Sequence, residues 1–275
     1  MKTRPLIAVL LGGVVLVAAV SGGIWYTTSI SPTICWGKDA NFDSPDAGVV
    51  KRGVTHLHLA ATVNACESAA RLIASGADVN VIDDTDTAPL HLAATKNAVE
   101  TSRLLIAHGA DVNVRDSDDR SPLHWAAVTD STETAELLIV HGAYLNVRDD
   151  DHKMAPLHIA AAKNAVEITE SLIEHGADVN ARDRENRTPL HFAAKFNAVE
   201  IAELLIANGA NVNAGRNTFT PLDSAIASAD RVIAHANEIK YPSKEEKKKY
   251  EKEKKEHEKM VHLLRAHGGE CNKRC

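Results

Sequence analysis

The sequence predicts an all-α repeat solenoid, and three observations lead to this fold class. A five-residue phrase, Gly-Ala-Asp-Val-Asn or a close variant, begins at Gly76, Gly109, Gly142, Gly176, Gly209 and Gly268. The first five of these glycines are 33 or 34 residues apart, and a fixed period of this length is typical of repeat architectures. Aromatic residues make up only 4% of the 275 residues, although 44% are hydrophobic. A core of small aliphatic side chains suits thin stacked layers better than one bulky centre.

The chain begins with an uncharged, apolar stretch. Lys2 and Arg4 are the last charges before Lys38, and the apolar run covers residues 6–20. A basic start followed by such a run is typical of a signal peptide, and continued to Tyr26 the run reaches about 21 residues, enough to span a bilayer. We expect residues 1–26 to be a signal peptide or an N-terminal transmembrane anchor, followed by a linker over 27–43. The alternative is an apolar helix buried in a cytosolic core.

Whether residues 1–26 are a signal peptide or an anchor, we expect the remainder of the chain to be exported, because Lys2 and Arg4 hold the N-terminus on the cytoplasmic side. The four cysteines lie outside the apolar stretch, and disulfides are typical of exported proteins. We predict the pairs Cys271–Cys275 and Cys35–Cys66. A metal site is the alternative for the two C-terminal cysteines, but a second ligand pair is missing from the sequence.

A second phrase lies upstream of each repeated glycine and predicts the helices. It reads THLHLAA from Thr55, APLHLAA from Ala88, SPLHWAA from Ser121, APLHIAA from Ala155, TPLHFAA from Thr188 and TPLDSAI from Thr220. Proline suits the first turn of a helix, and Thr or Ser just before it can cap that helix. The first helix of each unit is expected to end near Asn64, Asn97, Asp130, Asn164 and Asn197, since these residues tolerate a left-handed backbone. A second helix, such as 199–206, has apolar residues three and four apart and is expected to end at the repeated glycine.

The last unit is longer than the others. Thr188 to Gly209 spans 21 positions, whereas Thr220 to Gly268 spans 48, and the insertion covers about 236–259. Pro242 and Ser243 indicate a helix start, so we expect one long charged helix from about Lys244 to residue 264, with Glu245–Lys249 and Glu251–Lys255 pairs. Its charged turns are expected to be solvated, with a basic contact site as the alternative.

These phrases and their period resemble the ankyrin repeat, over about residues 44–272. The resemblance implies a domain over 44–275 with six helix-turn-helix repeats joined by β-hairpin fingers, the last containing the extended charged helix. It also implies that the histidines of the phrase, namely His58, His91, His124, His158 and His191, form hydrogen bonds within and between repeats. His56 replaces proline in the first repeat and Asp223 replaces histidine in the last, as expected of terminal repeats.

By the same resemblance, a partner is expected on the concave surface, which consists of the fingers and the exposed ends of the first helices. The acidic candidates for partner binding are Asp83, Asp84, Asp86, Asp116, Asp118, Asp119, Asp149, Asp150 and Asp151. The other candidates are Lys96, Thr129, Tyr144, Lys163, Arg184, Lys195, Phe196 and Phe219. Residues 5–239 contain 17 basic and 30 acidic residues, a net charge of −13, which argues against nucleic acid and favours a protein partner with a basic patch.

Two sharper interpretations of single residues are less favoured. The aspartate clusters are compatible with Ca²⁺, but they lack the spacing of a calcium loop, and Asp is common in turns for local hydrogen bonding. Trp125 and Phe192 occupy a slot held elsewhere by Leu59, Leu92 and Ile159, so they are expected to pack in the core. We therefore predict no metal site and no cofactor.

The function expected from the sequence is protein binding outside the cytoplasm, in a bacterial periplasm or from an inner-membrane anchor. The partner is expected to be a basic effector or an envelope enzyme, and the chain is expected to be a monomer. One version is an immunity or inhibitor protein for a toxin or lipase; the other is a scaffold that supports an envelope enzyme. A hydrolase or metal-dependent enzyme is the alternative of a different class, but no catalytic motif stands outside the repeat phrases.

Overall fold

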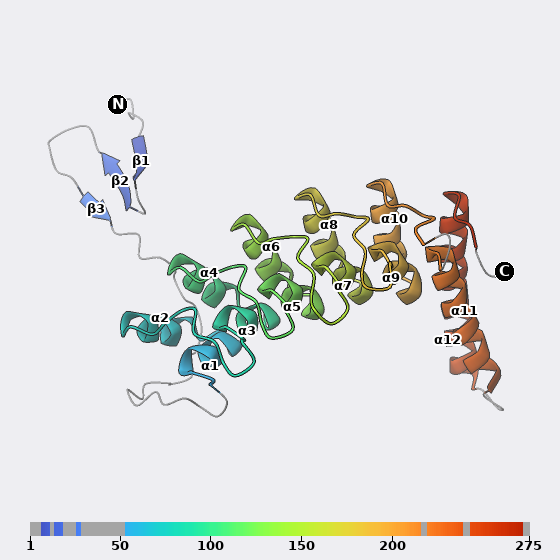
Figure 1. Ribbon diagram of the computed structural model, residues 1–275, viewed down its shortest axis with the longest axis horizontal. Coiled ribbons are helices and arrows are strands. Elements are labelled where there is room, and N and C mark those ends of the chain that lie inside the picture. Colours follow the sequence, from blue (N-terminus) through green and yellow to red (C-terminus); the bar gives the residue numbers. More distant parts are fainter. Residues whose placement is uncertain are drawn as a thin grey trace. The chain divides into compact units, whose positions relative to one another are not determined.

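The structure is a computed structural model that describes residues 7–11, 14–18, 26–28, 53–215, 219–238 and 243–271. The chain divides into two compact units, Met1–Trp36 and Gly37–Cys275. In the first unit, β1 (Ile7–Leu11), β2 (Val14–Ala18) and β3 (Tyr26–Thr28) form an antiparallel sheet in the order β1-β2-β3 (Figure 1). Ile7 lies opposite Ala18, and Val15 lies opposite Thr28.

These strands occupy the segment for which the sequence predicts a signal peptide or a transmembrane anchor. Among the residues that the structure describes, no helix is both long and apolar enough to cross a membrane. The transmembrane helix expected in residues 1–26 is therefore not found in their described parts, where valines suited to extended backbone form strands. Cleavage and export of the chain remain predictions.

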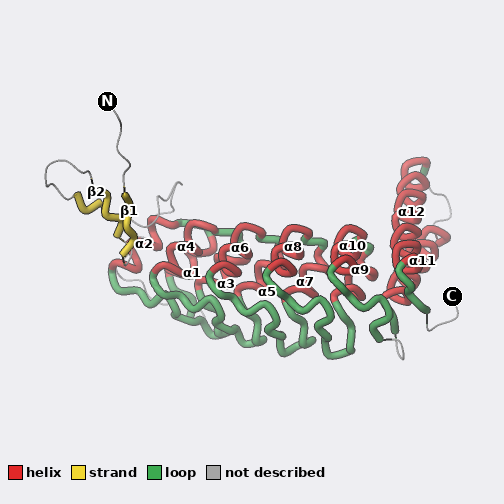
Figure 2. Tube along the Cα trace, turned by 90° about the horizontal axis from the view of Figure 1, so that it is seen from above, coloured by secondary structure: helices red, strands yellow, loops and turns green. Residues whose placement is uncertain are grey.

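The second unit contains six consecutive helix pairs in its described residues. The pairs are α1 (His56–Thr62) with α2 (Cys66–Ala74), α3 (Pro89–Thr95) with α4 (Val99–Ala107), α5 (Pro122–Thr129) with α6 (Thr132–Val140), α7 (Pro156–Lys163) with α8 (Val166–Glu174), α9 (Pro189–Phe196) with α10 (Val199–Ala207), and α11 (Pro221–Glu238) with α12 (Lys244–Ala266). The first helices form one row and the second helices another (Figure 2). First helices contact one another more extensively than second helices do. Closer packing shortens that side of a stack, so we infer that the first-helix row lies on the inner, concave side.

The helix ends confirm the positions that the sequence predicts. The five residues expected to end the first helices, Asn64, Asn97, Asp130, Asn164 and Asn197, all have φ between 51° and 58°. The repeated glycines follow the second helices with φ between 81° and 93°, a conformation that costs Gly no side-chain clash. The chain can therefore reverse direction within a few residues at both ends of each pair.

The core consists of small and aliphatic side chains repeated at the same positions. The paired alanines of the phrase, such as Ala93 and Ala94, are completely buried, and so are the leucines before them, such as Leu123. Phe192 is buried, whereas Trp125 is half-buried and its Nε1 donates a hydrogen bond of 2.8 Å to Asp116 Oδ2. Both aromatic residues are thus engaged within the stack, as expected, and neither is freely exposed.

The last helix pair is longer than the others and extends past the end of the stack. We define the C-terminal arm as residues 229–238 of α11 and 244–256 of α12, which run side by side (Figure 1). Ser243 begins α12 with a capping box: its Oγ accepts a hydrogen bond from Glu246 N at 3.2 Å, and its own N–H donates to Glu246 Oε2 at 2.7 Å. The predicted helix start is therefore confirmed, but Lys249 pairs with Glu253 at 3.8 Å and not with the predicted Glu245.

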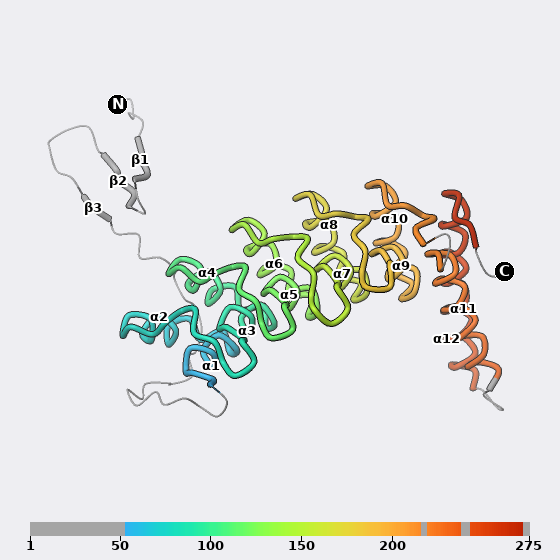
Figure 3. The backbone as a smooth tube through the Cα atoms, in the orientation of Figure 1, coloured from blue at the N-terminus to red at the C-terminus, as the bar shows by residue number. Residues whose placement is uncertain are grey.

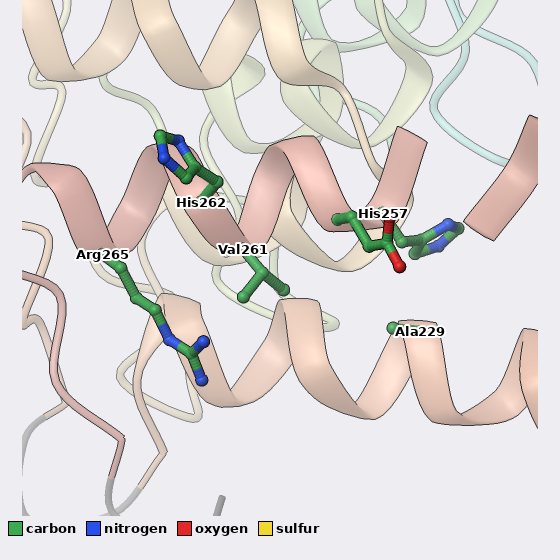
Figure 4. A pocket seen from close by; sticks show the side chains of 6 residues that line it. Ala229, His257, Val261, His262 and Arg265 are labelled. Atoms are coloured by element: carbon green, nitrogen blue, oxygen red, sulfur yellow. The ribbon is translucent and has the colours of Figure 1, made fainter. Parts of the chain in front are cut away.

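The base of the arm is tied to the preceding repeat. The Ser228 hydroxyl donates to the Lys195 carbonyl at 2.8 Å, and its Oγ lies 3.2 Å from His257 Nε2. His257 also lines a small pocket of about 250 Å³ between α11 and α12, together with His262 and Arg265 (Figure 4). These contacts join α9, α11 and α12 at the base of the arm.

Candidate functional site

The histidines of the repeated phrase form a regular set of ties between neighbouring repeats. In each of the five, Nδ1 accepts a hydrogen bond from the backbone N–H of the residue before the helix, for example Ser121 N to His124 at 3.1 Å. The opposite nitrogen, Nε2, reaches a carbonyl in the next finger, for example His91 to Arg120 O at 3.0 Å. Because a carbonyl only accepts, Nε2 must hold the proton and Nδ1 must be bare. The hydrogen bonds expected within and between repeats are therefore present.

The same geometry changes one expectation about capping. In the first, third and fifth repeats the hydroxyl of the Thr or Ser before the first helix contacts the histidine Nδ1, as in Thr188 to His191 at 3.0 Å, whereas in the last repeat the Thr220 hydroxyl caps the helix by accepting from Asp223 N at 3.2 Å. In the last repeat the carboxylate of Asp223 takes over the role of the histidine and accepts from Thr220 N at 2.8 Å. The departure from histidine at this position thus preserves the local hydrogen bond.

The connections between helix pairs, called fingers here, span residues 81–87, 114–120, 147–154 and 181–187. In these four fully described fingers the predicted β-hairpins are absent: they are tight turns without strands. A backbone bond closes each finger, as from Asp116 N to Arg120 O at 3.0 Å, and three of the fingers have a second backbone bond within the turn, as from Asp119 N to Asp116 O at 2.9 Å. The reverse bond of a hairpin does not form, because Arg120 N–H donates to the Asp116 side chain at 2.8 Å.

The first aspartate of each finger organises its turn. The carboxylates of Asp83, Asp116, Asp149 and Asp183 each accept hydrogen bonds from two backbone N–H groups of the same finger. Burial opposes ionisation of Asp83, but hydrogen bonds from Thr85 and Thr87 outweigh it and hold its pKa below the usual value. Three of these residues, Asp83, Asp116 and Asp149, are predicted to bind a partner; in the structure their carboxylates hold the turns, and partner binding by them stays a prediction.

Successive fingers are also bonded to each other. Ser117 N donates to Thr85 O at 3.0 Å, Asp150 N to Asp118 O at 2.9 Å, and Arg184 N to His152 O at 2.8 Å. The fingertips therefore form a continuous edge along the stack, where the connecting loops follow one another (Figure 3).

Most acidic groups at this edge are paired within the chain. Asp118 lies 3.2 Å from Arg120, Asp119 lies 2.7 Å from Arg115, and Asp150 lies 2.5 Å from Lys153. The hydrogen bond and the charge of Lys153 lower the pKa of Asp150. Asp151 lies 3.3 Å from His152, a contact that gains charge only if the histidine is protonated. Asp84 and Asp86 are exposed and lack an ion pair within the described part of the first finger.

The inner side of the stack has two rows of exposed residues at equivalent positions of successive repeats. The helix-end row lies where the first helices end and consists of Val63, Lys96, Thr129, Lys163 and Phe196. The finger-base row consists of Ile82, Arg115, Arg148 and Arg182. The sequence predicts four of the helix-end residues but none of the finger-base row as a site. The finger-base row does have a sequence signal: each of its residues lies two positions after a Val-Asn or Leu-Asn pair, once in every repeat.

The aromatic candidates are not brought together. Phe196 is 52% exposed at the end of α9, and the Lys195 Nζ lies 5.1 Å from the centre of its ring. Tyr144 is 63% exposed, but it lies in the loop after α6, where its N–H bonds Asn113 Oδ1 at 2.7 Å. Phe219 is half-buried in the last finger, and its carbonyl accepts from His191. Only Phe196 belongs to the helix-end row.

The outer, second-helix side is acidic. Asn64 and Asn97, at the ends of α1 and α3, donate to Glu100 and Glu133 of the following repeat. Asp130 stands at the next equivalent position, where its partial burial and the charge of Glu167 raise its pKa. A shallow groove of about 300 Å³ between α6 and α8 is lined by Glu136, Val140, Glu167, Glu170, Ser171, Glu174 and His175.

The two predicted disulfides fall partly outside the described residues. Cys66 begins α2 and is buried, and Cys271 follows α12; both are disulfide-bonded. Cys35 and Cys275, their predicted partners, lie outside the described residues, so both pairings stay predictions.

A comparison with known protein families identifies the family of this chain. The family model for ankyrin repeats in three copies matches residues 57–149, 115–183 and 157–235, whereas a search of curated proteins finds no significant match. Domains of this family are protein-interaction modules, in keeping with an exposed inner face that the packing of the stack does not use. The matches together span residues 57–235, more than half of the 275 residues, and the chain belongs to the ankyrin-repeat family.

Proposed function

We propose that this chain is exported and binds a partner protein through its concave face, outside the cytoplasm. The partner is a toxin or a lipase, which the chain inhibits in the manner of an immunity protein. The alternative is a scaffold that stabilises an envelope enzyme. The apolar residues 6–20 and the four cysteines support export.

The observation that carries the proposal is the helix-end row. Its side chains are exposed, and they are not needed to hold the repeats together, because the buried alanines, leucines and histidines do that. Phe196 leaves 52% of its surface in water at the end of this row. An exposed aromatic residue flanked by cations is the kind of anchor that protein interfaces favour.

The test compares two exposed apolar residues at helix ends on opposite sides of the stack. Phe196→Ser changes the concave face, and Val140→Ser, at a residue 73% exposed on α6, is the matched control. We expect partner recovery from detergent-solubilised cells, quantified by mass spectrometry, to fall by about tenfold for Phe196→Ser and to stay unchanged for Val140→Ser. Loss with Val140→Ser alone would place the interface on the outer face and contradict the proposal.

Inhibitor and scaffold differ in their effect on the purified partner. An inhibitor lowers the partner's activity when added in equal amount, whereas a scaffold leaves activity intact and lengthens the partner's half-life at raised temperature. Fractionation tests export separately. Recovery of the whole population as a cytosolic protein with four free thiols would contradict it.

A further inference from the structure

Stacking of the repeats brings charged residues of different repeats together on the concave face. Residues about 33 positions apart meet in the same row, so cations scattered along the chain become neighbours. The helix-end row brings together Lys96 and Lys163, with Lys195 beside Phe196, and the finger-base row contributes Arg182. All of these side chains are exposed or half-exposed.

We infer that the partner presents an extended, acidic protein segment to these two rows, with an apolar side chain over Phe196. This inference rests on the proposed function and names the chemistry of its partner. It reverses the expectation of a basic partner docked on acidic fingers.

The ion pairs within the chain indicate whether the partner is acidic or basic. Asp119, Asp118 and Asp150 of the second and third fingers are paired with Arg115, Arg120 and Lys153 of their own fingers, and Asp151 lies against His152. Lys96, Lys163 and Arg182 form no ion pair with any residue that the structure describes. In the two inner rows of the middle repeats, the charges that have no ion pair among the described residues are therefore positive, and they attract carboxylates without first breaking an internal pair.

The spacing of the row limits the shape of the segment. Neighbouring packed helices lie about 8–10 Å apart, and an extended chain advances about 3.3 Å per residue, so about three residues cross one repeat. Lys96 and Lys163 are two repeats apart, which matches carboxylates about six residues apart in the partner. Phe196 follows one repeat further, about three residues beyond the second carboxylate.

Nucleic acid is the other polyanion that such a row attracts. The carboxylates of Asp84 and Asp86 on the first finger, which form no ion pair with any described residue, and the acidic outer face repel a continuous phosphate backbone. A protein segment can place its carboxylates at the cations alone, and we therefore favour it.

Fluorescence anisotropy with the full chain tests the inference with defined probes. The first probe is a labelled peptide with Glu at every third position, Ser between, and one Phe after the last Glu. The second replaces each Glu by Lys, and the third is single-stranded DNA of equal charge. The variant Lys96→Glu/Lys163→Glu is compared with Lys252→Glu/Lys255→Glu, which reverses two exposed lysines of α12.

We expect the Glu peptide to bind more tightly than the Lys peptide, to weaken about tenfold or more in the first variant, and to change less than about twofold in the second. Tighter binding of the Lys peptide, an equal loss in both variants, or no binding of the Glu peptide would overturn the inference. DNA binding that exceeds the Glu peptide and is lost in the first variant would identify nucleic acid instead. If Phe196→Ser still abolishes partner recovery while the Glu peptide fails to bind, the proposed function stands and only this inference falls.

Discussion

At the scale of single residues, the histidines of the repeated phrase link protonation to folding. Each uses a bare Nδ1 to accept a backbone N–H and a protonated Nε2 to donate to the next finger, so the neutral ring satisfies both neighbours. Burial lowers the pKa of His91, His158 and His191, and it lowers the pKa of His124 to about 4. Protonation therefore opposes both the burial and the hydrogen bonding of these rings.

Acidification is expected to destabilise the stack. An unfolded histidine has a pKa of about 6.5, above that of buried His124, so the unfolded state binds the proton first as the pH falls. The contribution of a neutral buried ring to the free energy of unfolding is complete above about pH 6.5 and is lost between about pH 6.5 and 4. For His124 alone this loss is about 3 kcal/mol. Urea unfolding measured across this range checks the loss.

His124→Gln isolates the contribution of one ring. It is expected to reduce the pH slope of stability by about 1.4 kcal/mol per pH unit between about pH 6 and 5, and His108→Gln, at an exposed histidine, is the matched control. Equal slopes in His124→Gln and the unmodified chain would show that His124 is not a neutral buried ring.

A second residue-scale prediction separates the two kinds of finger aspartate. Asp116→Asn keeps an acceptor for the turn but points an amide N–H at Trp125 Nε1, and we expect it to cost about 1–3 kcal/mol of unfolding free energy. Asp118→Asn, which loses only an exposed ion pair with Arg120, is expected to cost about 0.5 kcal/mol or less. Denaturant unfolding of both proteins measures the difference, and equal costs would refute the assignment.

At the scale of elements, the junctions between repeats differ although the helices repeat. Asn64 Oδ1 accepts from Thr101 N at 3.3 Å and its Nδ2 donates to Glu100 at 3.0 Å, which joins the first repeat to the second. At the third junction the side chain of Asp130 has no N–H to donate, and its carboxylate is repelled by the charge of Glu167. At the last junction Asn197 Oδ1 is buried and has no hydrogen-bond partner among the described residues, because α12 continues through the position where the other second helices begin.

Asp130→Asn is expected to stabilise the stack by about 0.5 kcal/mol at neutral pH, since it restores the donor and removes a repulsion at a partly exposed site. The gain is expected to shrink on acidification, because the raised pKa of Asp130 lets it accept a proton and lose the repulsion. Asn97→Asp, which creates the same acidic contact with Glu133, is the mirror control and should be destabilising. Thermal unfolding measures both, and a destabilised Asp130→Asn protein would contradict this account.

Local signals explain why the helices were predictable and the fingers were not. Pro89 suits a helix start, and Asn97 and Gly109 tolerate the left-handed backbone at helix ends, so each boundary depends on the residue itself. The roles of Asp116 and Asp118 depend on which backbone N–H and which arginine lie within reach in the folded finger. The inner rows arise only when residues of different repeats are stacked, so Arg182 acquires its neighbours through packing.

At the scale of the whole molecule, the arm is an addition to a stack that is otherwise regular. The part of α11 over residues 221–228 and the part of α12 over 258–266 match α9 and α10 in length and register, and Met260 and Leu264 are buried as in other second helices. The remaining turns of α12 are mostly exposed. The stack therefore does not depend on the arm for its core.

Replacing residues 229–257 by Asn-Ala, the connection that follows Phe196, is expected to leave a folded stack. Helical content should fall by the share of the deleted turns, and the melting temperature should change by about 2–4 °C or less, as for a change of about 1 kcal/mol. Circular dichroism measures both quantities. A protein that no longer melts cooperatively would show that the arm is required for the last repeat.

The central claim is that the concave face, and not the outer face, contacts a partner. A photo-crosslinking amino acid placed at Lys163 or at Glu170 tests it directly, because both positions are exposed and belong to the same repeat but lie on α7 and α8. On illumination in cells that make the partner, the protein carrying the crosslinker at position 163 is predicted to form a covalent adduct, and the protein carrying it at position 170 is not. An adduct from position 170 with none from position 163 would contradict the account.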